Sequence, residues 1–225
     1  MRPGSGSAGM VFMTTDEPDS VVQPSEYVRD LPIGVELTPT TDLFAWDVFP
    51  FAKDAEGRVH IRQLDQPVLP EPPRNGEDGP GDCVICDKPD ESYLWTDEHW
   101  RVAYQDPKQR RGAVATLFLE PRVHTDLGDL SAERAVELGP MIVRVERALA
   151  SLEGVGRVHV NRWGDGLAHL HLWFTARPAG MLQLRGTFLP LWNALLPRVS
   201  EEYFHAVNVK LAAALEKDGG RAHVR

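Results

Sequence analysis

The side chains of this sequence best suited to bind a metal ion are two cysteines and two histidines. Cys83 and Cys86 form a C-x-x-C pair and are the only cysteines in the chain. A structural zinc ion takes four thiolate or imidazole ligands, so the pair needs two more. His124 directly follows the apolar segment ATLFLEP, which would hold it rigidly, and His169 lies in AHLHLW. We therefore expect a structural Zn²⁺ ion bound by these four residues.

The cysteine pair has two other uses. A redox-active C-x-x-C opens a helix after a strand, whereas the residues after Cys86, DKPDESY, predict no helix. Two reduced cysteines in a turn, without a metal, are the second alternative. Two cysteines are also too few for a protein held together by disulfides, so we expect a cytoplasmic protein.

A third histidine follows two residues after His169. Side chains alternate along a strand, so His169, His171 and Trp173 share one face of AHLHLWF, and the leucines and the phenylalanine share the other. The leucine face is expected to be core. A single histidine on a strand is most often structural, but two on one face indicate a function beyond packing.

The strands that must position these residues read as an antiparallel sheet. Two strands are expected within residues 92–106, around a turn at 96–98, and a third in the apolar segment 112–121. Residues 156–163 and 168–176 predict two more, joined by a short Gly-Asp-Gly turn. Hairpin-like connections favour an α+β fold with the helices on one face of the sheet.

Two helices are expected to cover that sheet. Apolar residues at steps of three and four predict a helix over residues 131–152, with Ser131 as N-cap. Pro140 should kink or split it. A second helix is predicted from the capping Ser200 to the stop at Gly219.

Composition divides the chain into four parts. Residues 1–25 are polar and predict a disordered tail, and residues 26–82 an N-terminal extension that ends in a linker rich in proline and glycine. Residues 83–178 carry the motifs and form the expected main domain. Residues 179–225 are expected to be a C-terminal helical extension.

The overall charge excludes some classes of partner. The formal net charge is -9, which repels phosphate backbones, so we expect no binding of nucleic acid in general. No apolar run is long enough to span a membrane, so we expect no membrane partner. Small anionic substrates remain possible, because the local charge of a pocket can differ from the net charge of the whole protein.

The motifs together resemble the histidine triad (HIT) superfamily. The matching text is CVICDK, GAVATLFLEPRVHTDLGDL and HVNRWGDGLAHLHLWF, within residues 83–178. The resemblance implies a HIT-like antiparallel sheet with a long helix, often in a homodimer, that binds nucleotides or nucleotide conjugates and acts at their α-phosphate. His171 takes the position of the family's nucleophile, and Asn161 lies where some members carry an active-site asparagine.

The resemblance also bears on the metal site. In the galactose-1-phosphate uridylyltransferase branch, zinc is held by a C-x-x-C, a downstream histidine and the first histidine of the triad. Those positions fall on the cysteine pair, His124 and His169, which agrees with the ligands expected from their spacing.

The third triad position departs from the family. It is normally histidine in the hydrolases and glutamine in the transferases and phosphorylases, and here it is Trp173. Indole has one N–H donor and no acceptor, so it can hold a phosphate oxygen but cannot protonate a leaving group. An active enzyme would therefore favour phosphate-type leaving groups, which need a proton least.

The expected function is that of a nucleotidyltransferase, phosphorylase or hydrolase with a covalent nucleotidyl-histidine intermediate at His171. Gly164 and Gly166 would let backbone N–H groups approach the phosphate, although simple turn chemistry also explains them. Arg162 and Arg177 are candidate phosphate clamps. The alternative is a catalytically inactive HIT-like module that binds a nucleotide or a protein, with a structural zinc and Trp173 filling the pocket.

Overall fold

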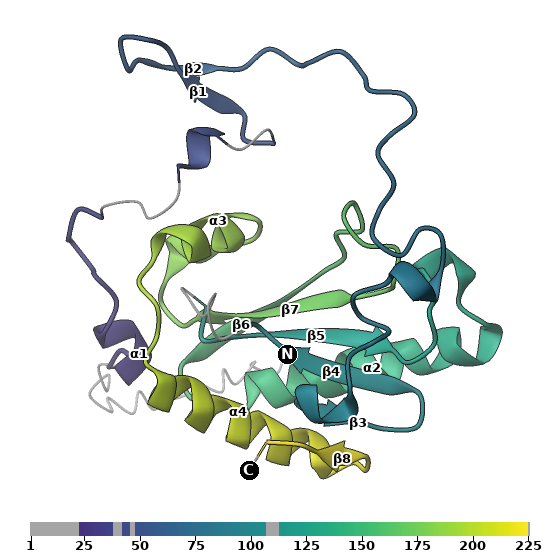
Figure 1. The fold of residues 1–225 in the computed structure, drawn as a ribbon. Coiled ribbons are helices and arrows are strands. Elements are labelled where there is room, and N and C mark those ends of the chain that lie inside the picture. Colours follow the sequence, from purple (N-terminus) through teal and green to yellow (C-terminus); the bar gives the residue numbers. More distant parts are fainter. Residues whose placement is uncertain (1–22, 38–41, 46–47, 107–112, 225) are drawn as a thin grey trace, which may run out of the picture.

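The computed structural model describes residues 23–37, 42–45, 48–106 and 113–224 (Figure 1). The predicted disordered tail therefore lies outside the described residues except for residues 23–25. Ser25 caps the short helix α1, Glu26–Arg29, by accepting a hydrogen bond from the backbone N–H of Val28.

A six-stranded antiparallel sheet forms the centre of the fold, with strand order β6-β7-β5-β4-β3-β8. This confirms the expected α+β class with an antiparallel sheet. β3 and β4 lie on either side of the expected turn, β5 carries ATLFLEP, and the short β8 at the sheet edge was not predicted. The bounds are β3 Trp95–Thr96, β4 Trp100–Tyr104, β5 Ala115–Pro121, β6 Val155–Asn161, β7 Leu172–Pro178 and β8 Arg221–Ala222.

Helices α2, Ala132–Ala150, and α4, Glu201–Glu216, lie together on one side of the sheet, whereas α3, Phe188–Leu195, lies on the other side (Figure 1). Both long helices begin at the predicted serine caps, whose side chains accept hydrogen bonds from the first turn. The main core lies between these two helices and the sheet. It includes Leu117, Leu149, Leu170, Phe174 and Leu211, all 0% exposed.

The expectation that Pro140 splits α2 is wrong. The helix runs unbroken through this residue. Proline lacks the N–H that would bond to the carbonyl of Val136. Both residues are exposed on the solvent side of α2, so water can satisfy that carbonyl.

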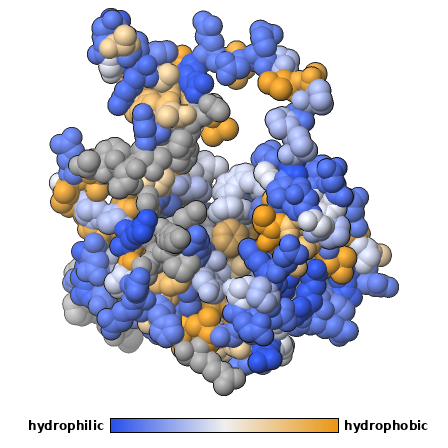
Figure 2. Space-filling model, in the orientation of Figure 1, coloured by the Kyte–Doolittle hydropathy of each residue, from blue (hydrophilic) through white to orange (hydrophobic). Residues whose placement is uncertain are grey.

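A small separate sheet precedes the main one in the chain. β1, Phe51–Lys53, pairs antiparallel with β2, Val59–Ile61, within the expected N-terminal extension. Apolar residues that follow it, including Leu64 and Leu69, are largely exposed, and in the space-filling view apolar patches occur along this arm (Figure 2). The remaining short elements are 3-10 turns: Leu43–Ala45, Pro80–Asp82, Asp90–Ser92, Leu127–Asp129 and Leu182–Leu184.

None of the described helices combines the length and the apolar character needed to cross a membrane.

Candidate functional site

The histidine segment lies just before β7 rather than inside it. β7 begins at Leu172, and residues 162–171 form a connection longer than the short turn that we expected. The alternation of faces nevertheless extends back to Leu170, which is buried in the core. Backbone bonds to two loops replace a strand partner: Leu170 N donates to Thr125 O at 2.7 Å, and Ala168 N to Asn75 O at 3.0 Å.

The four expected metal ligands come together in space. Their ligand atoms all lie within 4.8 Å of one another. Nδ1 of His169 is 3.6 Å from Sγ of Cys83 and 3.4 Å from Sγ of Cys86. Nδ1 of His124 is 3.3 Å from Sγ of Cys86. A tetrahedral zinc site has sulfur–nitrogen edges of about 3.6 Å, so the group could hold a metal ion.

The outer nitrogens of both imidazoles meet backbone carbonyls. Nε2 of His169 lies 2.8 Å from the oxygen of Pro121, and Nε2 of His124 lies 3.0 Å from the oxygen of Gly76. With each Nε2–H donating to its carbonyl, each Nδ1 keeps its lone pair for a cation. The two rings are thereby fixed with their ligand atoms facing the cysteines.

Burial sets the protonation of these groups. It lowers the pKa of His169 to about 4, so the imidazole is neutral at physiological pH and fit to bind a metal. Burial, together with the adjacent Cys83, raises the pKa of the Cys86 thiol to about 11. The thiol therefore keeps its proton unless a cation displaces it.

Gly76 is part of this group, although its sequence context predicted only a loop. Its φ is +77°, and a Cβ there would lie 2.9 Å from Cε1 of His124 and 3.1 Å from Cβ of Cys83. Its neighbour Asn75 accepts a hydrogen bond from Val84 N at 3.0 Å and donates to Asp82 O at 2.6 Å. The available signal was the Asn-Gly pair, which is typical of a tight turn.

An ion-pair network that sequence reasoning missed ties three loops together beside the metal group. Arg74 Nη1 lies 2.7 Å from Asp126 Oδ2, and Arg162 pairs with the other oxygen of Asp126. Burial raises the pKa of Asp126, but hydrogen bonds from the two arginines outweigh it and bring the pKa to about 2. Arg162 is thus engaged in an ion pair, and a Cβ at Gly164 would collide with its guanidinium.

The remaining contacts of the candidate loop glycines and of Arg177 are also within the protein. Gly166 O accepts from Asn75 N, and Gly164 O accepts from Arg74. Arg177 is buried and donates to the backbone oxygens of Pro178 and Met181, at 2.9 and 3.2 Å.

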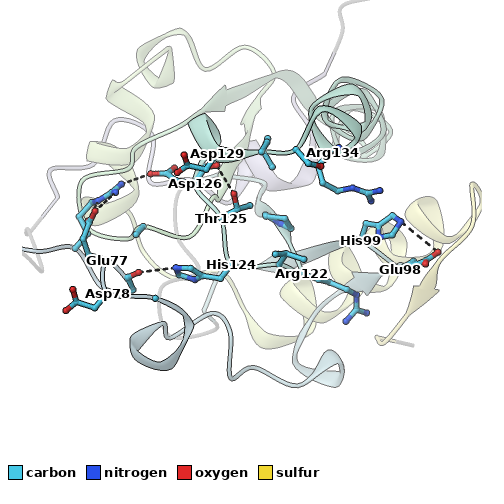
Figure 3. Close-up of a pocket in the computed structure, with 18 residues that line it drawn as sticks. Glu77, Asp78, Glu98, His99, Arg122, His124, Thr125, Asp126, Asp129 and Arg134 are labelled. Carbon is cyan, nitrogen blue, oxygen red and sulfur yellow. Dashed lines mark hydrogen bonds and ion pairs between the residues drawn. The ribbon is translucent and has the colours of Figure 1, made fainter.

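A cavity of about 800 Å³ opens beside His124. Arg122, Arg134 and His99 lie at one end and Glu77 and Asp78 at the other (Figure 3). Its arginines are already paired: Arg122 binds Asp90 at 2.7 and 2.8 Å, and Arg134 binds Glu137 at 2.7 Å. Of the ligating and triad histidines only His124 lines this cavity, which therefore adjoins the metal group but not His171.

His171 is partly buried and well oriented. Its Nδ1 lies 2.8 Å from the backbone oxygen of His169, and none of the described residues hydrogen-bonds to its Nε2. Trp173 follows on the same face, with its ring centroid 6.4 Å from that of His171. Asn161 stands directly opposite Trp173 in the β6–β7 pairing.

Trp173 packs into an aromatic group. Phe118 and Trp163 meet it edge-on, with centroid separations of 4.5 and 5.4 Å. Its Nε1 is buried and has no hydrogen-bond partner among the described residues. Phe118 and Trp163 were not singled out in the sequence.

Comparison with known proteins returns structures only. No protein-family model and no curated protein matches the chain. A zinc-bound histidine triad family protein from Mycobacterium smegmatis is 22% identical, with a TM-score of 0.45, over 62% of this chain and 96% of that chain. A histidine triad protein from Marinobacter aquaeolei VT8 is 23% identical, with a TM-score of 0.45, over 56% and 88%. A uridylyltransferase is 18% identical, with a TM-score of 0.44, over 61% of this chain and 46% of that chain.

The structural neighbours thus belong to the two groups that the motifs resemble, histidine triad proteins and uridylyltransferases. At these identities the likeness concerns the fold alone. The chemistry of the site rests on its own residues.

Proposed function

We propose that this protein is a nucleotidyltransferase or hydrolase that acts at the α-phosphate of a nucleotide conjugate through His171. The observation that carries the proposal is the bond between His171 Nδ1 and the backbone oxygen of His169. Since a carbonyl can only accept, Nδ1 is the nitrogen that keeps its hydrogen, and in the neutral imidazole the lone pair is on Nε2. Nucleophilic catalysis requires an oriented ring of this tautomer, with the attacking nitrogen away from the fixed hydrogen bond.

The proposed reaction has two displacements. Nε2 of His171 attacks the α-phosphorus, the phosphorus–oxygen bond to the leaving group breaks, and that oxygen departs with the electron pair. Water or an acceptor hydroxyl then attacks the nucleotidyl-histidine, its proton passes to solvent, and the phosphorus–nitrogen bond breaks. His171 is regenerated. Splitting one displacement into two lowers the barrier of each.

The neighbouring side chains favour leaving groups that need no proton. Trp173 stands where an acid or amide would assist, and an indole cannot give up its proton. A pyrophosphate or sugar phosphate departs as a stable anion, whereas an alkoxide does not. We therefore propose donors with phosphate-type leaving groups, with Asn161 and Trp173 in contact with the substrate.

We propose Zn²⁺ as the ion of the metal group, held by Cys83, Cys86, His124 and His169. Two thiolates and two imidazoles suit zinc, and four protein ligands leave no open position for a substrate. Its role is structural. It joins the cysteine loop to the segment that carries His171, and Gly164 and Gly166 belong to the same tied loops. A homodimer in the cytoplasm remains a prediction.

A second candidate function is favoured by the packing of Trp173. Phe118 and Trp163 hold its ring in place, and its bulk exceeds that of histidine or glutamine. If it occupies the substrate's place, the protein is a binding module that retains a nucleotide without turning it over.

Turnover assays separate the two functions. Diadenosine polyphosphates, nucleotide sugars and adenylyl sulfate would be offered to the wild type and to His171→Ala, with His205→Ala as a control for loss of an exposed histidine. The enzyme predicts product release that His171→Ala abolishes and His205→Ala retains. Binding without product from every donor would favour the module. Equal metal content in all three proteins shows that the site is intact.

A further inference from the structure

Arg101 of β4 is a buried cation with unused hydrogen-bond donors. It is 4% exposed, and Nε and Nη2 of its guanidinium have no hydrogen-bond partner among the described residues. The adjacent residues of β4, Trp100 and Val102, belong to the main core, so Arg101 points to the other face of the sheet. Native proteins rarely bury an unpaired charge, so this guanidinium calls for an anion nearby.

The carboxyl group across the sheet is not that anion. Glu120 stands directly opposite Arg101 in the β4–β5 pairing. No ion pair joins these two side chains, and Oε2 of Glu120 also has no partner in the described part of the chain. Burial raises the pKa of Glu120, which favours its uncharged form. An uncharged carboxyl group does not balance the charge of a guanidinium.

The guanidinium lies against residues that contact the metal group. Its Cζ is 4.6 Å from the centroid of the Tyr93 ring, a cation–π contact. The Tyr93 hydroxyl donates to the backbone oxygen of Ile85, between the two cysteines, at 3.4 Å. The residue after the cross-strand partner of Arg101 is Pro121, whose backbone oxygen accepts from Nε2 of His169. The neighbours of Arg101 thus touch both the cysteine turn and His169.

The charge of Arg101 also reaches the metal group directly. It interacts electrostatically with two of the four potential ligands, Cys86 and His169. The imidazole carries no negative charge, but a metal ion converts the bound thiols to thiolates. A thiolate is stabilised by a neighbouring cation. The metal-bound cysteine therefore supplies the kind of anion that the guanidinium needs.

We infer that Arg101 is a positioning residue of the metal group, and that its guanidinium pairs with the Cys86 thiolate that a bound metal ion generates. On binding, the thiol proton passes to solvent and the sulfur bonds to the ion. The unused N–H groups donate to that sulfur and hold it in place, as outer donors do around metal ligands. This inference rests on the metal ion of the proposed function and does not depend on catalysis at His171.

Zinc affinity tests the pairing. Arg101→Met keeps the apolar stem but removes the charge and the donors, whereas Arg101→Lys keeps the charge. In competition with a chelating indicator, we expect Arg101→Met to bind zinc about tenfold or more weakly than the wild type and Arg101→Lys to restore most of the affinity. Arg144→Met is the matched control, because Arg144 stacks on Trp95 and donates to backbone oxygens of the last turns. It should leave the zinc affinity unchanged. Arg101→Gln gives the same comparison if Arg101→Met does not fold.

Two further readouts would not respond to a purely structural arginine. With zinc bound, Arg101→Met loses the pairing and should melt at a lower temperature than the wild type. After chelation, the wild type keeps a buried cation without its anion, so the difference between the two proteins should shrink or change sign. Cobalt(II) in place of zinc reports on the sulfur itself. Its thiolate-to-cobalt absorption should move to longer wavelength in Arg101→Met, because the sulfur loses a hydrogen-bond donor.

The outcomes separate this inference from the proposed function. If Arg101→Met bound zinc as tightly as the wild type and lost the same melting temperature with and without zinc, the pairing would be overturned and the metal ion kept. If the wild type bound no zinc, the metal ion and the pairing would both be overturned. Neither result bears on His171, which the turnover assays test.

Discussion

At the scale of single residues, two histidines separated by one leucine have different environments. His169 is fully buried and faces the cysteines, whereas His171 is partly exposed. The two are linked, because the backbone carbonyl of His169 accepts the hydrogen bond from Nδ1 of His171. A metal ion that fixes His169 would also fix the orientation of the proposed nucleophile.

Gly76→Ala should weaken the metal group. The new Cβ would meet His124 and Cys83 in a backbone conformation that alanine disfavours. We expect a loss of about 1–3 kcal/mol in the free energy of unfolding of the metal-loaded protein and a weaker metal affinity, measured by denaturation and by competition with a chelator. Gly34→Ala is the matched control, since Gly34 has a similar φ of +74° and no atom within 4 Å. Unchanged metal affinity in Gly76→Ala would contradict this placement.

Asp126→Asn should destabilise the protein near neutral pH. The folded pKa of Asp126, about 2, lies below its unfolded value of about 4. The carboxylate therefore stabilises the fold above pH 4, and this contribution is lost as the pH falls toward 2. We expect a cost of about 1–2 kcal/mol at pH 7 that shrinks below pH 4, measured by urea denaturation. Asp165→Asn, in the loop that carries Arg162, is the charge control. If the free energy of unfolding of Asp126→Asn differed from that of the wild type by the same amount at every pH, the Asp126 carboxylate would not stabilise the fold through its charge.

At the scale of elements, periodicity and capping predicted both long helices, because Ser131 and Ser200 begin them as expected. Two other features were not predicted, because they depend on tertiary contacts. The segment 168–171 is held by Asn75 and Thr125 rather than by a strand, and β8 exists because β3 offers it an edge. Local sequence carries no record of such partners.

Pro140→Ala should stabilise α2. Alanine restores the N–H that can bond to the carbonyl of Val136, and it has the higher helix propensity. We expect a gain of about 1–3 kcal/mol in the free energy of unfolding, measured by urea denaturation. Gly139→Ala, at the preceding exposed position, is the control for a gain in helix propensity without a restored N–H. A destabilised Pro140→Ala would mean that the proline ring contributes packing on this face.

At the scale of the whole molecule, the four residues of the metal group were predicted from the sequence, whereas the loop residues that surround them were not. The four potential ligands were identified by residue type, by the C-x-x-C spacing of the cysteines and, for His124, by its place at the end of an apolar segment. Arg74, Asn75 and Gly76 were not, because they lie in a stretch rich in proline and glycine that has no periodicity. Their contacts with residues 124–126 and 162–168 depend on how the loops cross, which only the fold determines.

Removal of the metal should destabilise the contacts between these loops. The ion would join residues from the cysteine loop, the end of β5 and the start of β7, so its loss removes free energy from the folded state alone. We expect about one zinc per chain by elemental analysis and a lower melting temperature after treatment with a strong chelator. The double variant Cys83→Ser with Cys86→Ser should melt at a temperature that the chelator does not change. If the wild type had the same melting temperature with and without the chelator, a stabilising metal ion would be contradicted.

The measurement that tests the central claim most directly is the intact mass of the protein after brief exposure to the donor panel. The account predicts a mass gain of one nucleotidyl group, which peptide mapping places on His171. The gain should be absent from His171→Ala and present in His205→Ala. A nucleotidyl group mapped to another residue, or turnover by His171→Ala at the wild-type rate, would contradict the account.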